Sequence, residues 1–76
     1  MLRGDLLLRL ERFEEAAVTY RAVVALEPRS ADAWANLGRS LLRLGRREEA
    51  RDAVSRALAI DAKNPAAGEV GRELGR

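Results

Sequence analysis

The chain has 76 residues, of which 47% are hydrophobic and 34% charged, with a formal net charge of +2 and neither cysteine nor histidine. Without these two residue types, disulfides, the usual zinc sites, thiol nucleophiles and imidazole bases are excluded. A single core of this size supplies only about 3–5 kcal/mol of stability. We therefore expect one small domain that depends on regular helix packing or on self-association.

Five helices are predicted, separated by short breaks. In chain order they cover approximately residues 2–10, 13–27, 31–44, 47–61 and 65–75. Pro28 prevents the second helix from continuing, and Ser30 is typical of the N-cap of the third. Gly45 lies where the third helix should end in a left-handed residue. Asn64 followed by Pro65 indicates an N-cap with proline at the first helical position.

An internal repeat of 34 residues spans most of the chain. The ordered block L-L-R-L-x-R-x-E-E-A occurs at residues 7–16 and again at residues 41–50, and Gly4 recurs as Gly38. A third copy begins near the end with one residue deleted and contains only its first helix. Repeats of this length are typically helix pairs that stack, because one pair alone cannot bury its apolar face.

The spacing of apolar residues predicts which side of each helix is buried. In the third helix the apolar side consists of Trp34, Leu37, Gly38, Leu41 and Leu44. The polar side consists of Asp32, Asn36, Arg39 and Arg43. In the fourth helix the apolar arc consists of Ala50, Ala53, Val54, Ala57, Leu58 and Ile60. We expect these two helices to fold back on each other antiparallel.

The second copy contains a set of residues at characteristic spacing, namely Trp34-Ala35-Asn36-Leu37-Gly38, Leu41-Leu42, Gly45, Glu49-Ala50, Val54, Ala57-Leu58 and Asp61. These residues resemble the motif W-x₂-L-G-x₂-Y, then A-x₃-F and A, of the tetratricopeptide repeat (TPR) family. The first copy matches through Gly4, Leu7, Phe13, Glu15-Ala16, Tyr20 and Pro28. Two departures are Arg47, where the first copy has the aromatic Phe13, and Ala62, where it has Pro28.

The resemblance implies an all-α fold of antiparallel helix-turn-helix repeats, stacked as a short right-handed solenoid. We expect residues 1–76 to form a single TPR-like domain. Within it, residues 1–30 form an N-terminally truncated first repeat and residues 31–64 a second repeat. Residues 65–76 then form the capping helix of a partial third repeat.

The resemblance also implies that the exposed side of the first helix in each pair lines a concave peptide-binding groove. The groove residues implied in this way are Arg9, Asp32, Asn36, Arg39, Arg43 and Arg72. Because guanidinium groups pair bidentately with carboxylates, a row of arginines favours an acidic peptide. The alternative is an ordinary solvated helix face on which arginine reflects codon usage.

The predicted function is therefore a protein–protein interaction module that is not an enzyme and has no catalytic, cofactor or metal site. Self-assembly, or a structural role within a larger TPR protein, is the alternative. Apolar ends at Leu2 and Leu6, and at Val70 and Leu74, favour a homodimer or end-to-end association. Nucleic acid is a less favoured partner, because the groove positions contain no aromatic residue for base stacking.

No apolar run approaches the roughly 18–20 residues that span a bilayer. Asp5, Arg9 and Glu11 interrupt the N-terminal segment, which is therefore unlike a signal peptide. The sequence predicts a cytoplasmic protein without membrane contact.

Overall fold

The computed structural model describes residues 2–75, with side chains described from Leu6 to Gly75. This range contains five helices and no strand: α1 (Leu2–Arg9), α2 (Phe13–Leu26), α3 (Ala31–Arg43), α4 (Arg47–Ile60) and α5 (Pro65–Leu74). All five predicted helices are confirmed, each ending one residue earlier than expected. No described helix has the length and apolarity needed to cross a membrane.

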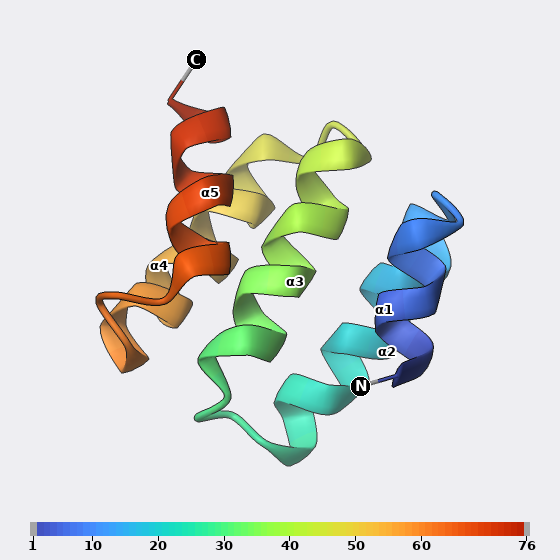
Figure 1. Ribbon diagram of the computed structural model, residues 1–76, viewed down its shortest axis with the longest axis horizontal. Helices are drawn as coiled ribbons and strands as arrows, with labels where there is room; N and C mark the ends of the chain where they lie inside the picture. The colour runs from blue at the N-terminus through green and yellow to red at the C-terminus, as the bar shows by residue number, and fades with distance from the viewer. Residues whose placement is uncertain (1, 76) are drawn as a thin grey trace.

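Successive helices run antiparallel, and α3 occupies the middle of the molecule (Figure 1). It packs against α2 on one side and against α4 and α5 on the other. The helices α1 and α2 form one pair, and α3 and α4 form the next. The predicted all-α helical-repeat fold is confirmed.

Side-chain caps begin α3 and α5, as predicted. The Ser30 hydroxyl accepts a hydrogen bond from the Ala33 amide at 3.3 Å. The Asn64 side-chain oxygen accepts one from the Ala67 amide at 2.9 Å. Each cap satisfies an amide that the helix itself leaves without a partner.

The turns that follow α1 and α3 share one backbone conformation. Gly45 has φ 81°, the expected left-handed value, and its repeat equivalent Glu11 has φ 59°. In both turns the next residue donates its amide to the carbonyl five positions back, at 2.9 Å. A left-handed residue other than glycine costs about 1–2 kcal/mol. The hydrogen bond and the packing of the helix pair hold Glu11 in this strained conformation.

The core is built mainly from alanine and other small residues on the facing sides of the helices. Its buried hydrophobic members on α2 to α5 are Ala16, Ala17, Tyr20, Val24, Ala31, Ala33, Ala35, Leu37, Leu41, Ala50, Ala53, Val54, Ala57, Ala67, Val70 and Leu74. The buried side of α3 is wider than predicted, because Ser40 is also fully buried. The Ser40 hydroxyl donates to the Asn36 carbonyl at 3.0 Å, so its burial leaves no unpaired donor.

Trp34 lies at the edge of this core and is only partly buried. Its indole N–H donates to the Pro28 carbonyl at 2.8 Å. The Arg56 guanidinium lies 5.0 Å from the ring centroid, within cation–π range. Trp34 therefore contacts both the turn between α2 and α3, through Pro28, and the outer side of α4, through Arg56.

Two expectations about apolar residues are wrong. Ile60 is 39% exposed, because it is the last residue of α4 and the turn that follows is itself exposed. Val70 and Leu74 are buried, because α5 packs against both α3 and α4, so they form no exposed C-terminal apolar end. At the other end Leu6 is 54% exposed as predicted, whereas the side chain of Leu2 lies outside the described residues.

Candidate functional site

An open hollow of about 500 Å³ lies between α1 and α3. Its lining residues are Leu8, Arg9, Glu11, Phe13, Arg39 and Arg43. Three of the six predicted groove residues, Arg9, Arg39 and Arg43, thus meet in one place. Leu8 and Phe13 are partly buried and add apolar surface to the hollow. In the sequence, Phe13 was noted only as a match to the family motif.

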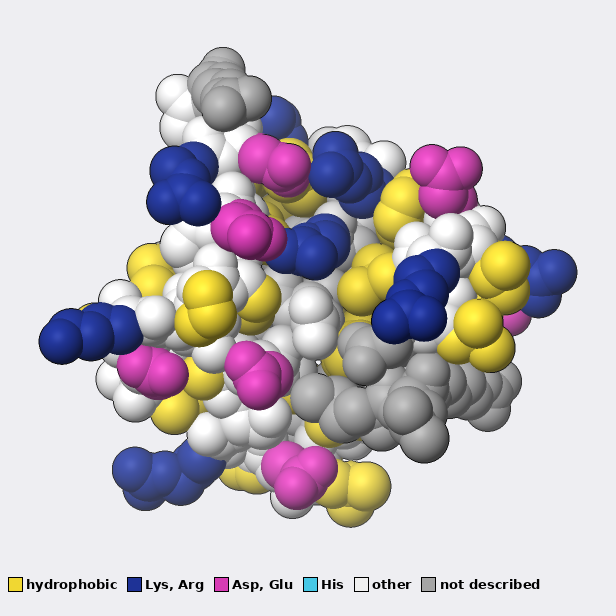
Figure 2. Space-filling model, viewed as in Figure 1, with side chains coloured by type: hydrophobic (Ala, Val, Ile, Leu, Met, Phe, Trp, Pro, Cys, Tyr) yellow, Lys and Arg dark blue, Asp and Glu magenta, His cyan; other side chains and the backbone are white. Residues whose placement is uncertain are grey.

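Arg39 and Arg43 also form ion pairs with α5. Arg39 lies 2.8 Å from Glu69, and Arg43 lies 3.3 Å from Glu73. The two pairs are one turn apart on both helices, and Figure 2 shows acidic and basic side chains meeting along the junction of α3 and α5. These side chains remain 32% to 59% exposed, so each pair contributes little net stability.

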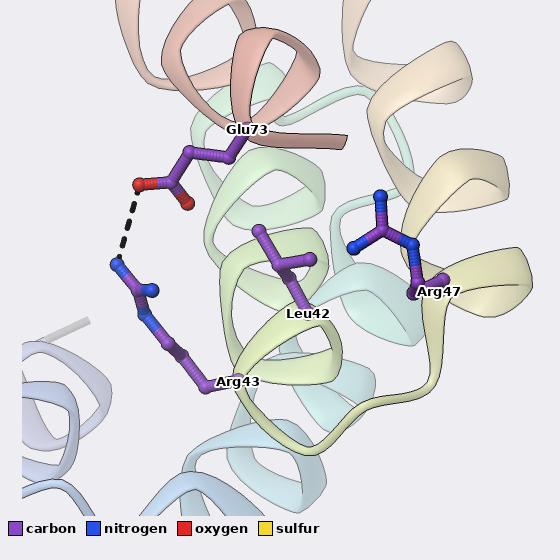
Figure 3. Close-up of a pocket in the computed structure, with 4 residues that line it drawn as sticks. All are labelled: Leu42, Arg43, Arg47 and Glu73. Carbon is purple, nitrogen blue, oxygen red and sulfur yellow. Dashed lines mark hydrogen bonds and ion pairs between the residues drawn. The ribbon is translucent and has the colours of Figure 1, made fainter. Parts of the chain in front are cut away.

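A second hollow, of about 390 Å³, lies at the end of this junction (Figure 3). It is lined by Leu42, Arg43, Arg47 and Glu73. Arg47 donates to the Leu74 carbonyl at 2.7 Å and thereby caps the end of α5. The second oxygen of Glu73, Oε2, is buried without a hydrogen-bond partner among the described residues. The ion pair with Arg43 therefore gives a hydrogen-bond partner to only one of the two carboxylate oxygens of Glu73.

The other three predicted groove residues do not line the hollow between α1 and α3. Asp32 accepts a 2.7 Å hydrogen bond from the side chain of Asn64, which ties the start of α3 to the turn before α5. Asn36 is partly buried on α3, and Arg72 is exposed on α5. Leu8, Glu11 and Phe13 were not predicted as groove residues. Of the three, only Leu8 could have been placed near Arg9 on α1, from the 3.6-residue periodicity of that helix.

The sequence model of the tetratricopeptide repeat family matches residues 1–65 of the chain. With the helix pairs described above, this match shows that the chain belongs to the tetratricopeptide repeat family. Repeats of this family generally mediate protein–protein interactions, and the family is a non-enzymatic interaction module. No curated protein matches the chain.

Proposed function

We propose that the hollow between α1 and α3 binds an acidic peptide segment of a partner protein. The observation that carries this proposal is the convergence of Arg9, Arg39 and Arg43 on one open hollow. Guanidinium groups bind carboxylates through two parallel N–H bonds, which Lys cannot reproduce. Leu8 and Phe13 supply apolar surface for the side chains between the acids.

The arginines of α3 can exchange partners at small cost. The Arg39 and Arg43 pairs each engage one terminal nitrogen of the guanidinium, and a guanidinium has five N–H donors. Exposed ion pairs contribute only about 0.2–1 kcal/mol. An incoming carboxylate can therefore share or replace Glu69 and Glu73. We propose that these two glutamates act as internal competitors that keep the affinity modest.

Charge reversal in the hollow is expected to weaken peptide binding. The probe is a fluorescently labelled peptide of alternating Glu and Leu, and its counterpart has Lys in place of Glu. We expect Arg39→Glu and Arg43→Glu each to raise the Kd about tenfold, because hydrogen bonds to charged groups contribute about 1.5–3 kcal/mol before screening. Anisotropy titrations at low and high salt measure this effect.

Lys63→Glu is the matched control, since it makes the same change of charge in the exposed turn between α4 and α5. It should leave the Kd nearly unchanged. Equal affinity for the Glu and Lys peptides, or equal Kd values for all three variants, would overturn the proposed site.

Removing the internal competitor should have the opposite effect. Glu73→Gln frees Arg43 and is expected to lower the Kd for the acidic peptide about two- to fivefold, in line with the energy of an exposed pair. Glu49→Gln is the control, because Glu49 forms a comparable 2.8 Å pair with Arg21 away from the hollow. A Glu73→Gln variant that binds no better than the Glu49→Gln variant would show that Glu73 does not compete.

A further inference from the structure

The second hollow is the repeat's copy of the hollow between α1 and α3. Leu42, Arg43 and Arg47 line the second hollow. The residues 34 positions earlier line the hollow between α1 and α3, and they are Leu8, Arg9 and Phe13. Two of the three positions keep the same residue type in both hollows. Arg47 is the exception, because it brings a guanidinium where the first copy has an aromatic ring. The proposed peptide site does not use this arginine.

A backbone hydrogen bond holds Arg47 next to Glu73. The guanidinium of Arg47 donates to the carbonyl of Leu74 at 2.7 Å, and Leu74 directly follows Glu73 in the chain. This bond uses one of the five N–H donors of the guanidinium, so the others remain for a further acceptor. Figure 3 shows Arg43 and Arg47 on the two sides of Leu42, with Glu73 reaching from α5 toward Arg43. Glu73 therefore has a second guanidinium within the same hollow.

The ion pair between Glu73 and Arg43 is a poor one. Its nitrogen–oxygen distance is 3.3 Å, whereas bonds between charged partners are typically about 2.7–2.9 Å. The pair of Arg39 with Glu69, one turn away, measures 2.8 Å. The Oε2 atom of Glu73 is buried without a hydrogen-bond partner among the described residues, which is unfavourable for a charged acceptor. Glu73 therefore loses little when it leaves Arg43.

We infer that Glu73 exchanges Arg43 for Arg47 when an acidic peptide binds, and that Arg47 thereby raises the affinity of the peptide site. This inference rests on the proposed function. Arg43 lines both hollows, so a peptide carboxylate that takes Arg43 leaves Glu73 without a partner in the second hollow. A guanidinium can bind both oxygens of a carboxylate, so a pair with Arg47 also gives Oε2 a partner.

The surroundings leave room for this exchange. The side chain of Glu73 is 38% exposed, and Arg47 is an exposed residue. The exchange lowers the cost of peptide binding without abolishing it, because Arg47 then divides its donors between Glu73 and the Leu74 carbonyl. Without Arg47, Glu73 would keep Arg43 as its partner and compete more strongly with the peptide.

Removal of the second guanidinium tests the inference. Arg47→Met is expected to raise the Kd for the peptide of alternating Glu and Leu about two- to fivefold, the range of an exposed ion pair. Arg46→Met is the matched control, since Arg46 forms a comparable 3.3 Å pair with Glu14 and lines neither hollow. It should leave the Kd nearly unchanged. Far-ultraviolet circular dichroism checks that both variants are folded. Equal Kd values for the two variants overturn the inference.

A double change separates the exchange from a structural role of Arg47. Arg47→Met also removes the bond to the Leu74 carbonyl, and a looser end of α5 would weaken binding whatever Glu73 does. In a Glu73→Gln background, no carboxylate remains to change partners, so Arg47→Met should leave the Kd unchanged there. An equal loss of affinity in both backgrounds would show that Arg47 only supports α5, and the exchange would be wrong.

NMR of the arginine side chains tests the exchange without a peptide. Arg43→Met imitates the loss of Arg43 to a ligand, so it should shift the Nε–Hε signal of Arg47 as Glu73 moves to it. When Glu73→Gln is already present, Arg43→Met should leave this signal in place. Peptide binding without the shift overturns the exchange. The shift without any peptide binding supports the exchange and overturns the proposed function instead.

Discussion

Tyr20→Ala is expected to leave most of the chain unfolded. Tyr20 has no exposed surface and is the largest fully buried side chain. Truncating a large buried aromatic residue to alanine costs about 3–5 kcal/mol. A domain of this size has only about that much stability in total. We expect the far-ultraviolet circular dichroism signal of helix to fall sharply, with no cooperative thermal transition.

Tyr20→Phe separates the ring from the hydroxyl group. This variant keeps the volume of the side chain, so it should remain folded with a cooperative melt. Val18→Ala is a second control, because it shortens an exposed side chain on the same helix. If Tyr20→Ala melted like Val18→Ala, α2 would not be packed in the core as described.

Gly38→Leu is expected to have the next largest effect, a loss of about 1–3 kcal/mol or more from overpacking. A Cβ atom at Gly38 would lie 3.0 Å from the Val54 side chain and 3.3 Å from the Ala50 carbonyl. The carbonyl belongs to the backbone of α4 and cannot rotate away. A larger side chain must therefore push α3 and α4 apart. Denaturant unfolding monitored by circular dichroism measures the loss.

The repeat equivalent of Gly38 provides the control. Among the described residues, a Cβ atom at Gly71 would meet only the Val54 side chain, at 3.7 Å, which is ordinary contact. Gly71→Ala should therefore stabilise the chain by up to about 1 kcal/mol, the difference in helix propensity between the two residues. A stabilising Gly38→Leu, or a strongly destabilising Gly71→Ala, would contradict the helix packing.

The helix boundaries could be predicted from the sequence because their determinants are local. Pro28, Ser30, Gly45 and the Asn64-Pro65 pair act through their own backbone geometry and hydrogen bonds. The 34-residue repeat then constrained the order and pairing of the helices. The left-handed residue at Glu11 could have been inferred only through its equivalence to Gly45, since glutamate itself gives no such signal.

The surroundings of the candidate site were harder to predict because they depend on how helices distant in sequence are aligned. Glu69 and Glu73 face Arg39 and Arg43 only in the register that α5 adopts against α3. The 34-residue repeat does not predict this register, because one residue is deleted in the third copy. Asn64 was predicted as a cap, but its second role, the hydrogen bond to Asp32, depends on the same register. The burial of Val70 and Leu74 was missed for this reason as well.

The candidate groove was predicted in part. The resemblance to the family implied a line of residues along successive helices, and the structure brings Arg9, Arg39 and Arg43 into one hollow. The apolar contribution of Phe13 was missed, because its match to the family motif gives no sign that it lies beside a hollow. Partial burial at the edge of a hollow is a tertiary property that a single sequence does not reveal.

The most direct test of the central claim is NMR detection of the arginine side chains during titration with the acidic peptide. The Nε–Hε signals of Arg9, Arg39 and Arg43 should shift together and saturate at one concentration of peptide. Those of Arg21 and Arg51, which lie outside the hollow, should stay nearly unchanged. Shifts spread evenly over all of the arginines would contradict a peptide site between α1 and α3.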